Sequence, residues 1–278
     1  MNVQELHLEM TRNCTLYCEH CLRGEKECKN ICFDTIDNIF MEVNYIYNLL
    51  LTGGEPLIAI SQLEYLIEVI KKRNVRIGKI TLVTNGTVMS SRVLKALKEL
   101  ARITYLRIDI SGDIFHKLEL ERLSLLELRN KNFKILHDLF VSEEYSIEYE
   151  KKTSYLSCVG RAELLSQDRL RDINGMIEGE YLIQPGLRTM SQPKFFIQEN
   201  SIFGYVPVDI YGNIVSYGQS FKEEDEQAER VNTNINQLGF KRALNNFIDY
   251  TNNQDIIAAR VPAKRWLYDN RGIAFRNY

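Results

Sequence analysis

Three cysteines stand close together near the start of the chain. Cys14, Cys18 and Cys21 form a C-x3-C-x2-C run, which places three thiolates on one short loop. That spacing suits three irons of a [4Fe–4S] cluster and leaves the fourth iron without a protein ligand. Such an iron can bind a substrate, whereas a fully ligated cluster mostly only passes electrons. The run therefore favours chemistry at an open iron.

Zinc is the main alternative for these thiols. Cys18 and Cys21 form a C-x2-C pair, and Cys28, Cys32 or His20 could complete a tetrahedral site. Disulfides fit less well, because the first ten residues carry charges where a signal peptide has an apolar core. Six cysteines in 278 residues are also too sparse for a secreted, disulfide-stapled framework. We expect a reducing, cytoplasmic compartment.

The second motif is the sequence LLLTGGEPL at Leu49–Leu57. An apolar run that ends in Gly53, Gly54 and Glu55 predicts a buried strand leading into a tight loop. The two glycines allow the backbone to approach a ligand closely. Glu55 adds a carboxylate at the carboxyl end of the strand, where parallel α/β sheets bind ligands. A plain strand-to-helix turn is the alternative interpretation.

Taken together, the two motifs resemble those of the radical S-adenosylmethionine (SAM) enzymes. The matching segments are CTLYCEHC at Cys14–Cys21 and TGGEP at Thr52–Pro56, with weaker matches at Val83–Gly86 and Asp109–Asp113. The resemblance covers residues 1–165 and is nearest to the peptide-modifying and sulfatase-maturing branch, together with molybdenum-cofactor-type cyclases. It implies one [4Fe–4S] cluster on the three cysteines of the run. It also implies that S-adenosylmethionine is cleaved reductively to a 5′-deoxyadenosyl radical, which abstracts hydrogen from a substrate.

The same resemblance implies a set of cofactor-binding residues. The loop of Gly53, Gly54 and Glu55 would hydrogen-bond the methionyl ammonium, for which a carboxylate and backbone carbonyls are suitable acceptors. His20, the residue before the third cysteine, would lie near the adenine. Ser111, at the end of the fourth strand, would bind the ribose or the methionyl carboxylate. Asn85 and Asp109 are further candidates, as neighbours of the cofactor site.

Several candidates have structural alternatives. Asn85 can cap a turn, because Asn-Gly is a strong turn signal. Asp109 can be a satisfied carboxylate within a strand, and Ser111 can be the N-cap of the next helix. Arg161, in a GRA sequence, is expected to pair either with the methionyl carboxylate or, as we prefer, with a surface acid. Arg122 matches an arginine of the branch only at an altered spacing.

Three cysteines lie outside the run: Cys28, Cys32 and Cys158. A second cluster would require a distant thiolate to meet a local pair. A catalytic thiol that donates hydrogen to a substrate radical is another hypothesis. The default is a free cysteine that is wholly or partly buried.

The pattern of elements predicts an α/β fold. Apolar segments alternate with amphipathic ones, and such βα units favour a parallel sheet with right-handed crossovers. The resemblance implies a partial (β/α)6 TIM-like barrel, open on one side, with a small C-terminal α+β extension. The predicted strands are Glu5–Met10, Leu49–Thr52, Lys79–Thr84, Tyr105–Ile110, Phe133–Phe140 and Tyr145–Tyr149, and the helices are Asp34–Val43, Gln62–Arg73 and Ser91–Ala101.

We expect two domains, a barrel over residues 1–170 and an extension over residues 171–278. Within the extension, Phe203–Val208 and Asn213–Tyr217 flank a turn and predict a β-hairpin. Helices are expected at Asn236–Ile248 and Asn253–Ala259. In the branch that the chain resembles, such a hairpin begins a region with auxiliary-cluster cysteines. Here Ser216 and Gly218 occupy those places and no cysteine follows Cys158, which excludes an auxiliary cluster in this region.

Composition narrows the choice of partner. The net charge of −2 gives no sign of a broad basic surface for nucleic acid, and no apolar run is long enough to span a membrane. The resemblance favours a peptide substrate and a flavodoxin- or ferredoxin-type electron donor, while a small-molecule substrate is equally compatible with the sequence. The competing hypothesis is a non-enzymatic iron–sulfur or zinc protein that carries electrons or acts as a sensor.

Overall fold

The computed structural model describes residues 1–21, 23–140, 147–149, 161, 164–166, 168–169, 172, 176, 196–198, 200–215, 226 and 228–253. Its centre is a 7-stranded sheet in the order β5-β4-β3-β2-β1-β7-β6. All neighbouring strands are parallel except β6 and β7. The strands are β1 (Asn2–Glu9), β2 (Tyr45–Thr52), β3 (Arg76–Thr84), β4 (Tyr105–Ile110), β5 (Ile147–Tyr149), β6 (Phe196–Gln198) and β7 (Ser201–Val208). The prediction of an open α/β sheet is confirmed.

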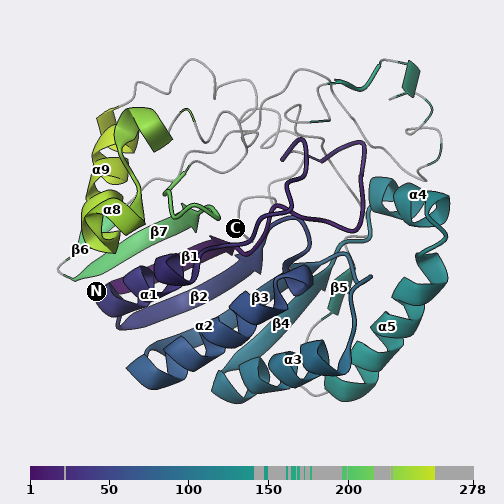
Figure 1. Cartoon of the computed structure of the whole chain (residues 1–278), viewed down its shortest axis with the longest axis horizontal. Coiled ribbons are helices and arrows are strands. Elements are labelled where there is room, and N and C mark those ends of the chain that lie inside the picture. Colours follow the sequence, from purple (N-terminus) through teal and green to yellow (C-terminus); the bar gives the residue numbers. More distant parts are fainter. Residues whose placement is uncertain are drawn as a thin grey trace.

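Helices cover one face of this sheet. Figure 1 shows α1, α2 and α3 side by side across β1 to β4, with α8 and α9 beside β6 and β7 and with α4 and α5 at the opposite end. The helices are α1 (Phe33–Glu42), α2 (Ile60–Arg73), α3 (Ser91–Ile103), α4 (Ile114–Arg122), α5 (Leu126–Phe140), α8 (Ile235–Leu238) and α9 (Phe240–Asn253), and a short 3-10 turn, η1, spans Pro56–Ile58. Within the described ranges, no helix combines the length and the apolar character that crossing a membrane requires.

Two rows of apolar side chains tie five strands into one core. Residues in register across neighbouring strands lie on the same face, so a shared row marks a shared core. The first row is Val206, Leu6, Leu49, Ile80 and Leu106, and the second is Val208, Leu8, Leu51, Leu82 and Ile108. All of these side chains are buried. Strand β7 therefore packs in the same core as β1, although it lies beyond the predicted boundary at residue 170.

The opposite face of the strands carries polar side chains. Thr81 donates to Asn48 over 3.0 Å, and Asn48 donates to Glu5 over 3.0 Å. His7 lies 2.7 Å from the same Glu5 carboxylate, and its ring stacks on Tyr205 with 5.2 Å between centroids. The period of two along a strand thus separates an apolar, helix-covered face from a polar one. The carboxyl ends of β1 to β4 lead into the loops that carry the predicted functional residues.

The predicted elements up to Ile110 are confirmed, with β2 and β3 longer than expected. The prediction of a strand at Phe133–Phe140 is wrong, because this segment is the second half of helix α5. Its apolar residues also fit a helical repeat, and Leu136 is fully buried while Phe133 packs against the core. The strand expected at Tyr145–Tyr149 is present as β5, which pairs with β4.

The C-terminal segments agree in part with expectation. Strand β7 ends in a tight turn in which Asp209 N–H donates to Asn213 O, and the second arm is reduced to isolated bridges at Asn213 and Ile214. The helix predicted at Asn236–Ile248 is divided into α8 and α9 at Gly239, whose φ of 79° favours glycine. The second arm beyond Val215, the helix beyond Asn253 and the positions Cys158, Ser216 and Gly218 lie outside the described residues. The division into two domains stays a prediction.

Candidate functional site

The loops after β1 to β4 surround a cavity of about 210 Å³. All three cysteines of the run, Cys14, Cys18 and Cys21, line it. The predicted cofactor-binding residues that also line it are His20, Gly53, Gly54, Asn85 and Ser111. Glu55 and Asp109 are not among the lining residues. The fold thus brings together predicted residues that are up to about one hundred positions apart in the sequence, as expected where parallel strands end at one edge of a sheet.

Hydrogen bonds within the cysteine loop shape it around the cavity. Cys21 N–H donates to Cys18 O over 3.1 Å, and Gly24 N–H donates to Cys21 O over 3.2 Å. On the other flank, Leu16 N–H approaches Cys14 Sγ at 3.4 Å. The loop therefore has a defined conformation held by its own backbone.

Arg161, which also lines the cavity, holds the same loop through three hydrogen bonds. Its Nε donates to Cys18 O over 3.0 Å, its Nη1 donates to Gly24 O over 2.6 Å, and its backbone N–H donates to Cys21 O over 3.0 Å. The guanidinium carbon lies 3.8 Å from the ring centroid of Tyr17. The side chain is only 8% exposed. Our prediction that Arg161 pairs with a surface acid is wrong, because a buried guanidinium instead caps carbonyls of the cysteine loop.

Burial sets the protonation of the thiols. Burial raises the pKa of Cys14 to about 11, and the nearby carboxylate of Glu55 acts in the same direction. Burial also raises the pKa of Cys18, with the negative charge of Asp113 adding to the effect. Both groups are therefore neutral thiols at neutral pH when no cation is bound. A bound metal centre would reverse this, because coordination removes the thiol proton. The raised pKa values of Cys14 and Cys18 differ from those of nucleophilic cysteines, whose pKa is lowered.

Glu55 is buried away from the cavity, with no exposed surface. Its carboxylate accepts hydrogen bonds from Leu57 N–H at 3.1 Å, from Thr84 Oγ1 at 2.8 Å and from Asn85 N–H at 2.8 Å. Burial raises the pKa of Glu55 to about 7, although these donors favour the charged form. The carboxylate therefore joins the loop after β2 to the loop after β3. The predicted contact of Glu55 with a methionyl ammonium stays a prediction.

The two glycines are required by close packing of loops. Gly53 has a φ of 139°, and a Cβ added there would lie 2.3 Å from Thr11 O. A Cβ on Gly54 would lie 2.2 Å from Asn13 O and 3.1 Å from Cys14 Cβ. Real side chains do not tolerate contacts of this length with backbone atoms. Any residue other than glycine would therefore push the loop after β2 away from the cysteine loop.

Asn85 caps a turn, as the structural alternative predicted, and its amide also reaches the cysteine loop. Its Oδ1 accepts from Thr87 N–H at 3.0 Å, as in a capped turn. Its Nδ2 donates to Thr15 Oγ1 over 3.0 Å and lies 3.6 Å from Cys14 Sγ. Ser111 lines the cavity, and the N-cap of α4 is Asp113, so the alternative that Ser111 caps this helix is wrong. A role in binding S-adenosylmethionine stays a prediction for both residues.

Asp109 and Arg122, two further candidates from the sequence, each form an ion pair with a residue close to them in the chain. Asp109 Oδ1 accepts from Arg107 Nε over 2.6 Å, which agrees with the structural alternative for this carboxylate. Arg122 donates to Glu119 over 2.7 Å, and the same carboxylate accepts from Tyr17 N–H in the cysteine loop. Both pairs lie beside the loops rather than in the lining of the cavity.

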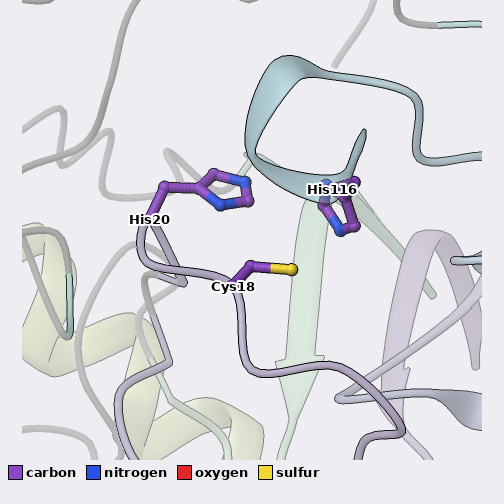
Figure 2. Close-up of side chains that lie close together, drawn as sticks. All are labelled: Cys18, His20 and His116. Carbon is purple, nitrogen blue, oxygen red and sulfur yellow. The ribbon is translucent and has the colours of Figure 1, made fainter. Parts of the chain in front are cut away.

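A pair of histidines faces Cys18, and sequence reasoning found only one of them. His20 stacks on Phe115 with 4.5 Å between ring centroids, and its ring meets the ring of His116 edge-on at 5.0 Å. Asp113 Oδ2 lies 2.5 Å from His116 Nδ1. Figure 2 shows both rings and the Cys18 sulfur converging on one space. The missed signal was the Asp-x-x-His spacing at the start of α4, which allows a cap residue to hold a histidine one turn later.

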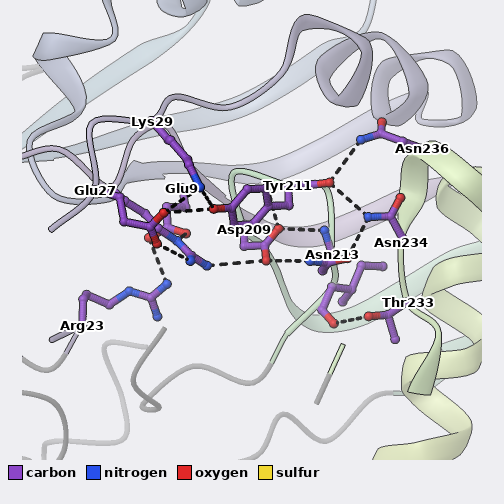
Figure 3. A network of polar contacts seen from close by, with 12 residues as sticks. Glu9, Arg23, Glu27, Lys29, Asp209, Tyr211, Asn213, Thr233, Asn234 and Asn236 are labelled. Carbon is purple, nitrogen blue, oxygen red and sulfur yellow. Dashed lines mark hydrogen bonds and ion pairs between the residues drawn. The ribbon is translucent and has the colours of Figure 1, made fainter. Parts of the chain in front are cut away.

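A polar network also joins the C-terminal segment to the start of the cysteine loop (Figure 3). Arg12, whose side chain has no exposed surface, forms ion pairs with Glu9 at 3.5 Å, Glu27 at 3.0 Å and Asp209 at 3.7 Å. Tyr211 donates to Glu27 over 3.0 Å, and its ring lies 4.9 Å from the Arg12 guanidinium carbon. The turn after β7 thereby supports the residues just before Cys14. Sequence reasoning missed Arg12, although a lone arginine beside the first cysteine was visible.

Two of the cysteines outside the run, Cys28 and Cys32, are among the described residues and lie away from the cavity. Cys28 and Cys32 are exposed and neither lines the cavity. Among the residues that the structure describes, neither of them is placed to complete a zinc site with Cys18 and Cys21 in the way the sequence allowed.

Comparisons with known proteins complete this description. The model of the radical SAM superfamily matches residues 8–139, and the curated proteins give no match. Among solved structures, native anSMEcpe with bound AdoMet and Cp18Cys peptide is 20% identical, with a TM-score of 0.42, and the match covers 53% of this chain and 42% of that one. Streptococcus suis SuiB bound to precursor peptide SuiA is 15% identical, with a TM-score of 0.40 and coverage of 76% and 58%. The chain thus spans less than two thirds of either protein.

The matched region holds the features on which the resemblance rests. Residues 8–139 include the cysteine run, the Gly-Gly-Glu loop and the strands β2 to β4 that carry the remaining cavity-lining loops. The sequence motifs and the family match therefore agree on the same part of the chain. Residues 8–139 thus form a segment that matches the radical SAM superfamily.

Proposed function

We propose that the chain is an enzyme that cleaves S-adenosylmethionine reductively and uses the resulting radical to abstract hydrogen from a substrate. The cofactors of a radical SAM domain are a [4Fe–4S] cluster and S-adenosylmethionine. The observation that carries the proposal is that Cys14, Cys18 and Cys21 line a single cavity together with Gly53 and Gly54. Three thiols and a glycine loop thus line one space, in which we place both cofactors.

The residues of the cavity fit an iron–sulfur cluster. Three thiols on one loop provide soft ligands, and burial of the Cys14 and Cys18 sulfurs raises the pKa of both, so that their charged form depends on a bound metal. Cys28 and Cys32 do not line the cavity, so within the described residues the set stays at three thiolates, as an open iron requires. When bound, the cluster supplies the electron and the open coordination site at which the sulfonium C–S bond of S-adenosylmethionine is broken.

Roles for this chain's own residues follow from their contacts. Asn85 holds the first cysteine through its amide, and a donor to a coordinating sulfur raises the reduction potential of a cluster. Gly54 keeps the loop after β2 in contact with the cysteine loop, through Gly54 N–H to Thr11 O at 2.7 Å. Ser111 and His20 stand at the cavity wall, where we infer contacts to the ribose and the adenine.

The substrate that we propose is a peptide. The support is the sequence resemblance to the peptide-modifying and sulfatase-maturing branch, carried by the cysteine run and TGGEP at Thr52–Pro56. A flavodoxin- or ferredoxin-type protein is the proposed electron donor, and the reducing cytoplasm is the proposed location. A small organic substrate is the alternative that the test must separate.

The test uses anaerobically reconstituted protein. We expect four irons per chain and an electron paramagnetic resonance signal of the reduced cluster that changes when S-adenosylmethionine is added. Release of 5′-deoxyadenosine should then be stimulated by peptides translated near the gene, and not by unrelated peptides of the same length. A cluster whose signal is indifferent to S-adenosylmethionine would overturn the proposal and favour an electron carrier. Stimulation by small metabolites alone would overturn the peptide assignment only.

A further inference from the structure

Cys18, His20 and His116 form a second potential ligand set within the cavity. One ligand atom from each lies within 4.8 Å of the others, and Figure 2 shows the three side chains pointing toward one another. We propose that the cluster-free protein binds a divalent transition metal such as Zn²⁺ or Co²⁺ through Cys18, His20 and His116, in competition with the cluster. The competition follows because both sites require the sulfur of Cys18. The metal site goes beyond the proposed function and stands without it, whereas the competition rests on the cluster proposed above.

The histidines are held as metal-binding histidines usually are. Such a histidine donates its second ring N–H to a carboxylate, which fixes the tautomer and the direction of the free nitrogen. Asp113 plays this part for His116, with Oδ2 at 2.5 Å from His116 Nδ1. His20 Nε2 lies 3.5 Å from Oδ1 of the same carboxylate, close enough for an ion pair when the ring is charged. The carboxylate is itself fixed as the N-cap of α4, where it accepts from Phe115 N–H and His116 N–H.

One ring nitrogen of His20 makes no hydrogen bond to the described residues in this arrangement. His20 Nδ1 is buried and has no hydrogen-bond partner within the described part of the chain. A buried polar atom without a partner is uncommon in folded proteins, and a site for a bound ion is one of its explanations. Stacking on Phe115 keeps the ring in place, so the nitrogen is not free to turn toward solvent. A metal ion bound to this atom would satisfy it.

The ligand set decides which metals would bind. Two imidazole nitrogens and one thiolate suit zinc, cobalt and related transition metals, and they do not suit Mg²⁺ or Ca²⁺, which require oxygen ligands. Three protein ligands leave a fourth tetrahedral position for water. Cys14 and Cys21 are not part of this set, which separates it experimentally from the cluster site.

The first experiment titrates metal-free protein with Co²⁺ under anaerobic conditions and follows its visible and near-ultraviolet absorption. The expected result is one bound Co²⁺ with tetrahedral ligand-field bands and a thiolate-to-metal charge-transfer band. The charge-transfer band should disappear in Cys18→Ala. Affinity should fall at least about tenfold in His20→Ala and in His116→Ala, and about 10–100-fold in Asp113→Asn, because outer-shell carboxylates contribute that much.

Two controls locate the metal. His137→Ala removes an exposed histidine of α5 and should leave binding unchanged. Cys14→Ala and Cys21→Ala should keep the Co²⁺ spectrum while losing the ability to assemble a cluster. His116→Ala should do the reverse, and its retained cluster would show that the variant is folded.

The second experiment tests the competition. Prior loading with one equivalent of Zn²⁺ should block cluster assembly in the natural protein and should not block it in His116→Ala. Co²⁺ binding that lacks a thiolate band, that persists unchanged in His116→Ala, or that is lost in Cys14→Ala and Cys21→Ala would overturn the inference. None of these results bears on whether the cluster, once assembled, cleaves S-adenosylmethionine, so the two proposals fail separately.

Discussion

Replacement of Arg161 by alanine tests how the cysteine loop is held. The side chain makes a buried bond to Cys18 O and a partly buried bond to Gly24 O, and its guanidinium covers the ring of Tyr17. A hydrogen bond from a charged group contributes about 1.5–3 kcal/mol. A cation–π contact adds about 0.5–2 kcal/mol. Allowing for water that replaces part of the bond to Gly24, we expect Arg161→Ala to lower the free energy of unfolding by about 4 kcal/mol.

Arg169 provides the matched control. It forms an ion pair with Glu19, another residue of the cysteine loop, at 2.9 Å, but the Arg169 side chain is 34% exposed and that of Glu19 is 47% exposed. Exposed pairs contribute at most about 1 kcal/mol. Arg169→Ala should therefore have little effect. Arg161→Lys should fall between the two, because an ammonium cannot bridge two carbonyls in the way that a guanidinium does.

The measurement is urea unfolding of cluster-free protein, followed by circular dichroism, together with iron content after reconstitution. If Arg161 stabilised only parts of the protein other than the cysteine loop, its replacement would lower the free energy of unfolding and leave the iron content unchanged. A contribution through the cysteine loop should also lower the iron content and shift the reduction potential of the cluster that remains. If Arg161→Ala and Arg169→Ala agreed within about 0.5 kcal/mol, the reasoning from burial and bonding would be refuted.

Three further predictions concern the supports of the site. Burial raises the pKa of Asp209 to about 6 from 3.8, so the contribution of this group to stability falls as pH rises from about 4 to 6. Between pH 4.5 and pH 7.5, the free energy of unfolding of Asp209→Asn in urea should therefore rise by about 2 kcal/mol relative to that of the natural protein. Parallel pH profiles of the two proteins would contradict this. Gly54→Ala places a Cβ 2.2 Å from Asn13 O, so we expect about 1–3 kcal/mol of destabilisation and reduced iron content, whereas full iron loading would count against the close-packed loops. In Glu55→Gln, the side-chain amide N–H would face a backbone N–H that now donates to the carboxylate, that of Leu57 or that of Asn85. Calorimetry should show a loss of about 1–3 kcal/mol in the free energy of unfolding, and an unchanged melting temperature would contradict this.

The elements that position the site were predictable because their signals are local. The segment Tyr105–Ile110 alternates apolar and polar residues and is strand β4 with those bounds. The segment Phe133–Phe140 failed because its apolar run fits both a strand and a helix, and only packing of Leu136 in the core decides between them. Gly239 shows the same limit, since a single positive φ divides one predicted helix into two.

The parts of the candidate site that could be predicted are those marked by short sequence motifs with a characteristic spacing. The cysteine run and the two glycines meet at one cavity, as expected. Arg161 was misjudged because burial of a charged side chain depends on carbonyls that become available only when the loop has folded. His116 was missed because its meaning depends on a partner in another segment, namely His20, which lies almost one hundred residues earlier. Contacts between distant loops carry no local signal.

The central claim is tested most directly by 5′-deoxyadenosine release from S-adenosylmethionine under dithionite. The account predicts release by the reconstituted natural protein, and its loss when Cys14, Cys18 and Cys21 are all replaced by alanine. Replacement of the exposed Cys28 should leave release intact. Undiminished release from the triple variant, or no release from a natural protein that carries its full cluster, would contradict the account.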